Sequence, residues 1–91
     1  PVVLIVLTNS GFGWVKAGQR ATGGHYFGVD FSTTDHAKVA MAYGIKAERV
    51  EDPADLNRVL GRAMSFQGPV LVDVVVQPLE EAKAPVSKWV A

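Results

Sequence analysis

The chain has 91 residues and a formal net charge of zero, with nine basic and nine acidic side chains. This length holds one small domain at most, and the balanced charge argues against a nucleic-acid footprint or a membrane-surface patch. No apolar run approaches the ~20 residues of a membrane span, and the lack of cysteine excludes disulfides and thiolate metal sites.

The chain opens on an uninterrupted apolar run from Val2 to Leu7. A short run rich in β-branched residues predicts a strand buried on both faces. It stops at residues 8–11, whose types favour turns and caps. Ligands of open α/β sheets bind beyond the carboxyl ends of strands, so the sequence places Asn9 and Gly11 where a ligand is expected.

A short helix is predicted to begin between Gly11 and Ala17, with Asn9 or Ser10 as its N-cap. Residues 18–30 contain three further glycines after Gly18 among polar and aromatic residues, and this composition predicts a loop.

A second helix is predicted to open at Ser32, because Ser32 and Asp35 form a variant capping box. Gly44 is its expected stop, and residues 45–50 are an expected second strand, less apolar and nearer an edge. The predicted apolar face of this helix consists of Ala37, Ala40, Met41 and Gly44.

A third helix is predicted to follow Asp52-Pro53, an acidic N-cap before a proline at the first helical position. Its expected buried stripe consists of Leu56, Val59, Leu60 and Ala63. Residues 70–76 then form a third apolar strand, interrupted by Asp73, which we expect either to cap a neighbouring helix or to lie at a subunit contact. Strands separated by helix-length crossovers predict a parallel sheet.

The segment Leu7-Thr-Asn-Ser-Gly-Phe-Gly13 resembles the end of the cofactor motif of thiamine-diphosphate enzymes. That motif begins with Gly-Asp-Gly and ends in an Asn pair after an apolar strand, and Thr8 stands in place of the first Asn. Segments 27–31, 35–44 and 68–74 extend the resemblance in order, most closely to the acetolactate synthase and benzoylformate decarboxylase branch.

The resemblance implies an α/β fold with three parallel strands and crossover helices, half of a thiamine-diphosphate-binding fold. Residues 1–77 would form part of the C-terminal domain, and residues 78–91 a tail. It gives Asn9, through its side chain, and Gly11, through its backbone oxygen, the role of Mg²⁺ ligands. The implied cofactor-binding residues are Asn9, Ser10, Gly11, Phe12 and Gly13.

Other interpretations of this segment remain open from the residues alone. Asn9 also suits a plain N-cap, and Gly11 a plain turn. Two rival phosphate motifs fail, because Lys16 occupies the third glycine position of a dinucleotide fingerprint and Gln19-Arg20 replace the Lys and Ser/Thr of a P-loop. His25 and His36 are expected to be solvated surface residues, too isolated to form a metal site.

The parent enzyme implied by the resemblance acts on a 2-oxo acid, as a carboligating transferase or a decarboxylating lyase, with thiamine diphosphate and Mg²⁺. The family's Gly-Asp-Gly aspartate and its cofactor-activating glutamate fall outside this chain, which starts at Pro1 without a methionine. We therefore expect a piece of a longer protein, cytoplasmic, that neither binds the cofactor tightly nor catalyses on its own.

Two alternatives belong to other classes of protein. One is a stand-alone α/β module that binds a phosphate or nucleotide, and the other is a structural, self-associating fragment. Partners are expected to be the missing remainder of the enzyme or a partner subunit, with neither nucleic acid nor membrane. Strands that are apolar on both faces need more cover than these helices supply, so we expect a homo-oligomer.

Overall fold

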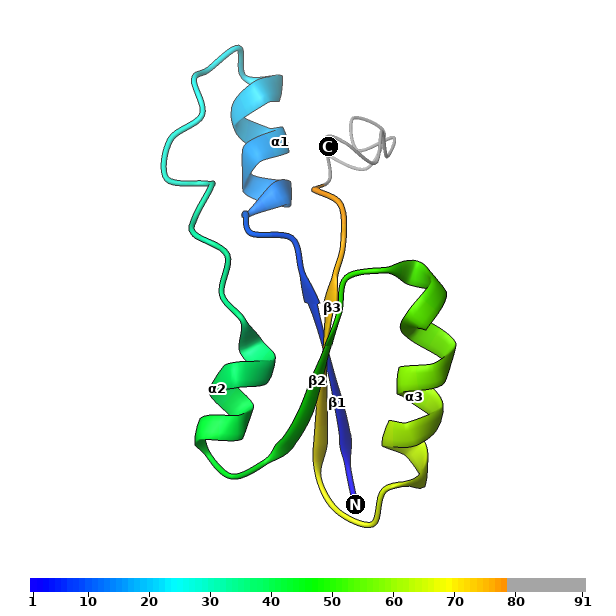
Figure 1. Cartoon of the computed structure of the whole chain (residues 1–91). Helices are drawn as coiled ribbons and strands as arrows, with labels where there is room; N and C mark the ends of the chain where they lie inside the picture. The colour runs from blue at the N-terminus through cyan, green and yellow to red at the C-terminus, as the bar shows by residue number, and fades with distance from the viewer. Residues whose placement is uncertain (79–91) are drawn as a thin grey trace. The chain divides into compact units, whose positions relative to one another are not determined.

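The computed structural model describes residues 1–78, and Figure 1 shows its elements. They are β1 (Val3–Thr8), α1 (Gly13–Ala21), α2 (His36–Ala42), β2 (Lys46–Val50), the short 3-10 helix η1 (Pro53–Asp55), α3 (Leu56–Ser65) and β3 (Val70–Val75). The predicted tail falls, from residue 79 on, outside the described residues. The chain divides into two compact units, Pro1–Thr8 with Thr34–Val76 and a second built on Asn9–Thr33, and each is described by itself.

The first unit is built on a three-stranded parallel sheet in the order β1-β3-β2. The prediction of an α/β fold with parallel strands and crossover helices is confirmed, as is the edge position of β2. In the register of the sheet, Asp73 of β3 lies opposite Val6 of β1 and Arg49 of β2. Residues paired across neighbouring strands project on the same face of the sheet, so Val6, Asp73 and Arg49 share one face. Thr8 lies two residues after Val6 on β1 and therefore projects on that face too.

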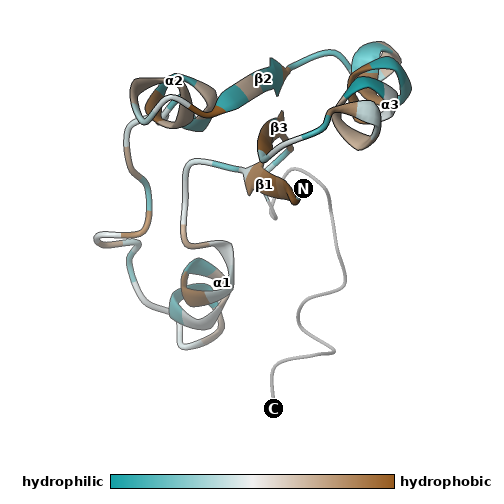
Figure 2. Cartoon of the chain, turned by 90° about the horizontal axis from the view of Figure 1, so that it is seen from below, coloured by the Kyte–Doolittle hydropathy of each residue, from teal (hydrophilic) through white to brown (hydrophobic). Residues whose placement is uncertain are grey.

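Helices α2 and α3 cover opposite faces of this sheet, on the side of β2 and β3 (Figure 2). Under α3 lies the apolar core, which consists of Val50, Val59, Ala63, Val70 and Val72. Under α2, Ala37 and Ala40 are buried as the helical spacing predicts. Met41 was expected on the same face but is 51% exposed.

The prediction that the first strand is buried on both faces is wrong for β1 in this structure. Leu4, Ile5 and Leu7 are 48%, 53% and 66% exposed. The physical reason is position: β1 is an edge strand, its neighbour is β3 alone, and the helices of its unit pack on β2 and β3. These three side chains therefore meet no covering layer within the unit, whereas Val3, at the start of the strand, packs partly against the core.

Of the helix starts predicted from the capping residues Ser32 and Asp52, one is confirmed and the other is shifted. Asp52 is confirmed as an N-cap, since its side chain accepts from the Ala54 N–H and Pro53 follows at the first position. Ser32 is not the start of α2: Asp35 caps it instead, accepting from the Lys38 N–H at 3.0 Å. An acid placed three residues before a free N–H satisfies that donor directly, so the helix begins after Asp35.

The second unit contains α1 and the segment that returns from it. The helix begins at Gly13 with Phe12 in the N-cap position and no side-chain cap. The expectation that Asn9 or Ser10 caps this helix is therefore wrong. Both residues lie too far ahead of the first helical turn, because an N-cap side chain reaches only the second or third N–H of its own helix.

Candidate functional site

The Asn9–Gly11 loop directly follows the last residue of β1. Within it, the Asn9 side-chain oxygen accepts a hydrogen bond from the Gly11 N–H at 3.3 Å, which closes an Asx turn. Ser10 adopts a left-handed backbone, with φ of 57°, and its hydroxyl lies 2.9 Å from that of Thr33. Asn9 is half-buried, so its carboxamide is not enclosed in a packed interior.

Gly11 lies against the segment that follows the glycine-rich loop. The Phe12 N–H donates to the Val29 carbonyl at 2.7 Å, and the Phe31 N–H donates to the Ser10 carbonyl at 3.1 Å. These bonds flank the antiparallel pair Gly11 and Asp30. In such a non-hydrogen-bonded pair the residue's own N–H and C=O point away from the partner strand, so the Gly11 carbonyl is directed outward.

The close approach of the two segments also explains why position 11 is glycine. A Cβ placed there would lie 3.0 Å from the Val29 carbonyl oxygen. That separation is tighter than ordinary van der Waals contact, so the neighbouring backbone would have to give way. A glycine at this position therefore lets the loop lie against residues 29–31.

The two predicted metal ligands offer a donor set that suits a hard cation. Mg²⁺ prefers oxygen ligands, and both the Asn9 carboxamide and the outward Gly11 carbonyl supply oxygen. Neither carries a charge, however, and within residues 1–78 no group of three His, Cys, Asp or Glu side chains is placed to hold a metal. The residues fit part of a magnesium site, and their metal role stays a prediction.

The other predicted cofactor residues lie at the start of α1. Phe12 is 56% exposed, and its ring meets that of Phe31 edge-on with centroids 5.0 Å apart. Gly13 is the first helical residue. Lys16 forms an ion pair with Asp30 at 3.2 Å and lies over the Tyr26 ring, so its charge is engaged within this unit.

A second polar cluster lies within the first unit, around Asp73. This carboxylate is fully buried in the central strand. One oxygen accepts a short hydrogen bond from the Thr8 hydroxyl, and the other accepts from the His36 backbone N–H and from Arg49 Nη1, both at 2.9 Å. Of the two expectations for Asp73, the cap of a neighbouring helix is confirmed, because His36 is the first residue of α2.

The protonation of Asp73 follows from these partners. Burial by itself raises the pKa of a carboxyl group, but the hydrogen bonds from Thr8 and from the His36 N–H, together with the Arg49 charge, hold the pKa of Asp73 below its ordinary value of 3.8. Asp73 is therefore ionised at neutral pH. No buried side-chain polar atom lacks a partner among the described residues, so the cluster is fully satisfied.

His36 belongs to this cluster and is not the isolated surface residue that was expected. Its Nδ1 lies 3.0 Å from the Thr8 hydroxyl oxygen and 3.5 Å from Asp73 Oδ2. Thr8 already donates its only proton to Asp73, so it can only accept from His36. His36 Nδ1 therefore carries a proton, and a His36–Thr8–Asp73 chain of hydrogen bonds runs into the sheet.

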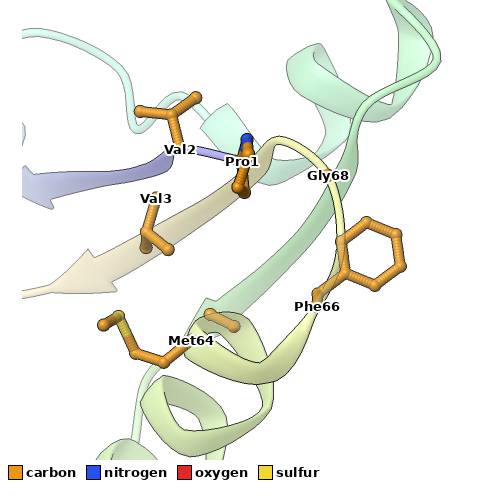
Figure 3. Close-up of a pocket in the computed structure, with 7 residues that line it drawn as sticks. Pro1, Val2, Val3, Met64, Phe66 and Gly68 are labelled. Carbon is orange, nitrogen blue, oxygen red and sulfur yellow. The ribbon is translucent and has the colours of Figure 1, made fainter.

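A shallow apolar pocket of about 360 Å³ lies at the other end of the first unit (Figure 3). It is lined by the start of the chain, by Met64 and Phe66 at the end of α3, and by Gly68. It offers no carboxylate, amide or hydroxyl side chain to orient a polar ligand. We therefore place the candidate site not in this pocket but at the Asn9–Gly11 loop, which follows the carboxyl end of β1.

The described helices also bear on membrane contact. None of those within residues 1–78 has the length and apolar character that crossing a membrane requires.

Known families and curated proteins resemble this sequence along most of its length. Residues 1–74 match the family described as thiamine pyrophosphate enzyme, C-terminal TPP binding domain. The chain is 37% identical over 76 residues to an acetolactate synthase of Bacillus subtilis (strain 168) and 35% identical over 80 residues to a probable acetolactate synthase large subunit of Methanococcus aeolicus. It is 34% identical over 79 residues to a pyruvate oxidase of Lactiplantibacillus plantarum.

These matches cover 84–86% of the chain but only 13% of each relative. The chain thus spans about an eighth of the length of the curated relatives it matches.

Proposed function

The chain belongs to the thiamine pyrophosphate enzymes, as part of their C-terminal TPP binding domain, and we propose that it contributes to the Mg²⁺–diphosphate site of a larger enzyme. The observation that carries this proposal is the Asn9–Gly11 loop. It follows directly on a strand's carboxyl end and offers a half-buried carboxamide oxygen and an outward carbonyl. This is the place where α/β sheets bind ligands.

Asn9 and Gly11 would act as two neutral oxygen ligands of the metal. Ser10, Phe12 and Gly13 would line the diphosphate, with Gly13 opening α1. The cofactor, when bound, would supply the means to stabilise negative charge on the carbonyl carbon of the substrate. The protein's part is to fix the position of the metal and to keep the loop rigid through its bonds to residues 29–31.

The substrate class in this proposal is a 2-oxo acid, in a carboligation or a decarboxylation. Its support is the set of similar proteins, which includes two named acetolactate synthase and one named pyruvate oxidase, whose name contains a 2-oxo acid. The enzyme would accordingly be a transferase or a lyase. Each of these relatives is several times longer than this chain, so the activity would draw on residues that these 91 do not include.

The incomplete donor set leads to a direct test on the 91-residue polypeptide. Two uncharged oxygens offset little of the cost of dehydrating Mg²⁺. Isothermal titration calorimetry with thiamine diphosphate and Mg²⁺ should therefore detect no submicromolar binding. The rest of the parent enzyme, which would supply a carboxylate ligand, should give submicromolar binding. Submicromolar binding to the 91-residue polypeptide alone would refute this account of the site.

Self-association is the second part of the proposal, and the exposure of β1 supports it. Leu4 projects on the face covered by α2, while Ile5 and Leu7 project on the face covered by α3, and all three are about half exposed or more. An apolar edge strand is a template for pairing with another chain. We therefore expect copies of this chain to associate through β1.

A further inference from the structure

The Thr8 hydroxyl is the one group that joins the end of β1 to the buried cluster within the part of the chain that the structure describes. It donates to Asp73 of β3 and accepts from His36 of α2. Thr8 is 5% exposed, and the residue that follows it is Asn9. The last residue of β1, from which the Asn9–Gly11 loop leaves the sheet, is therefore held by a side chain that donates one hydrogen bond and accepts another.

Asp73 is in turn held in place from several directions. Arg49, opposite it in the register, donates to Oδ2 and also to the Thr34 carbonyl at 3.1 Å. The His36 backbone N–H donates to the same oxygen. With Thr8, the direct partners of the carboxylate come from β1, α2 and β2, so three elements meet around one buried charge.

We propose that Asp73, acting through Thr8, is a positioning residue for the Asn9–Gly11 loop. The metal-ligand part of this inference rests on the proposed function, whereas the fixing of the loop does not. Neither Asp73 nor Thr8 touches the metal in this proposal. Partners behind a metal ligand restrict its orientation, and their loss typically lowers metal affinity by about 10- to 100-fold.

The chemistry of position 8 sharpens the proposal. The residue there must donate one hydrogen bond to Asp73 and accept one from His36 Nδ1. Serine does both through one hydroxyl, and asparagine does both through separate amide nitrogen and oxygen atoms. Valine has the shape of threonine but can do neither. The positioning role therefore predicts that Thr8→Ser and Thr8→Asn retain the loop geometry and that Thr8→Val loses it.

The experiment uses NMR spectroscopy on the full 91-residue chain, first without metal. The backbone amide shift of Gly11 should move in Thr8→Val and Asp73→Asn and should stay near wild type in Thr8→Ser. Asn9 is compared only between wild type and Asp73→Asn, because any substitution at position 8 shifts the amide of the next residue. The matched control is Val59→Ala, which opens the α3 side of the core and lowers stability without touching the cluster. Unchanged shifts in Thr8→Val and Asp73→Asn, or equal movement in Val59→Ala, would overturn the proposal.

The second arm adds millimolar Mn²⁺ with thiamine diphosphate as a paramagnetic probe of weak binding. In the wild type, the signals of Asn9 and Gly11 should broaden selectively. About tenfold more Mn²⁺ should be needed in Thr8→Val, and a near wild-type amount in Thr8→Asn and Val59→Ala. No selective broadening in the wild type would contradict the proposed function alone, and the metal-free arm would still decide the positioning role. If Thr8→Val does not fold, the comparison of Asp73→Asn with Thr8→Ser serves the same purpose.

Discussion

The strands β1 and β3 have nearly the same composition and opposite environments. Both are apolar runs with one polar residue, yet Val70 and Val72 of β3 are buried while Ile5 and Leu7 of β1 are more than half exposed. The difference comes from their places in the sheet, since β3 is central and β1 is at an edge. Apolar content therefore indicates which strands have side chains to bury, and the strand order determines which of these strands the helices of this chain cover.

The largest effect is expected at the polar residue of β3. Asp73→Asn removes the charge that pairs with Arg49 and weakens three hydrogen bonds, and breaking a buried ion pair on one side is strongly destabilising. Because Arg49 keeps a partly exposed side chain, we expect a loss of about 2–4 kcal/mol in the free energy of unfolding. Urea denaturation followed by circular dichroism measures it, and a loss below about 1 kcal/mol would show that the cluster adds little.

The next prediction compares the two strands directly. Val72→Ala deletes methyl groups from a fully buried position and should cost about 2 kcal/mol. Leu7→Ala removes a larger side chain from a site that is 66% exposed and should change stability by no more than about 0.5 kcal/mol. The same denaturation experiment at low protein concentration tests both. Equal losses would mean that β1 is covered in solution.

The pH dependence of unfolding gives a third, smaller effect. The pKa of Asp73 is lowered in the folded chain, so the unfolded state binds this proton more readily. The stabilisation is fully present above the unfolded-state pKa of about 3.9 and is lost as the pH falls through the folded-state value. The wild type should thus lose stability below about pH 4 more steeply than Asp73→Asn. Parallel curves for the two proteins would be inconsistent with an ionised Asp73.

Self-association is the most easily reversed of the predicted effects. If copies pair through the exposed edge, a lysine in place of Ile5 should disrupt the pairing, because a charge on an edge strand opposes strand addition. Sedimentation velocity should show the wild type associating as its concentration rises, and Ile5→Lys remaining monomeric. A lysine in place of Met41, which is 51% exposed and lies on α2, a helix that packs on β2 and β3, is the control and should leave association unchanged. A wild type that stays monomeric at high concentration would contradict the interface.

The helix starts could be predicted from the sequence where adjacent residues signal them. Asp52-Pro53 signals a helix start through adjacent residues, and the structure confirms it. Ser32 and Asp35 are both good caps a few residues apart, and local pattern could not choose between them. Asp35 caps the helix because its side chain reaches the Lys38 N–H.

The Asp73 cluster could be predicted only in part. A carboxylate within an apolar strand signals that partners exist, and a helix cap was one of the two expectations. The partners themselves lie 24 to 65 residues away in the sequence, so they depend on strand order and register. The role of His36 could not be predicted for this reason, because its ring reaches Thr8 only when the fold packs α2 on the face of the sheet to which Thr8 projects. Asn9 and Gly11 could be singled out because turn, strand end and motif coincide in one short segment.

The contact between Gly11 and the Val29 carbonyl has a consequence for engineering. A methyl group at position 11 would lie 3.0 Å from that oxygen, so Gly11→Ala would require the Val29 carbonyl, eighteen positions downstream, to shift by a few tenths of an ångström. A change in the backbone path of residues 29–31 therefore also bears on the loop at 9–11. A library that alters the backbone path of one stretch should therefore vary the other as well, because two backbone hydrogen bonds and this close approach join them.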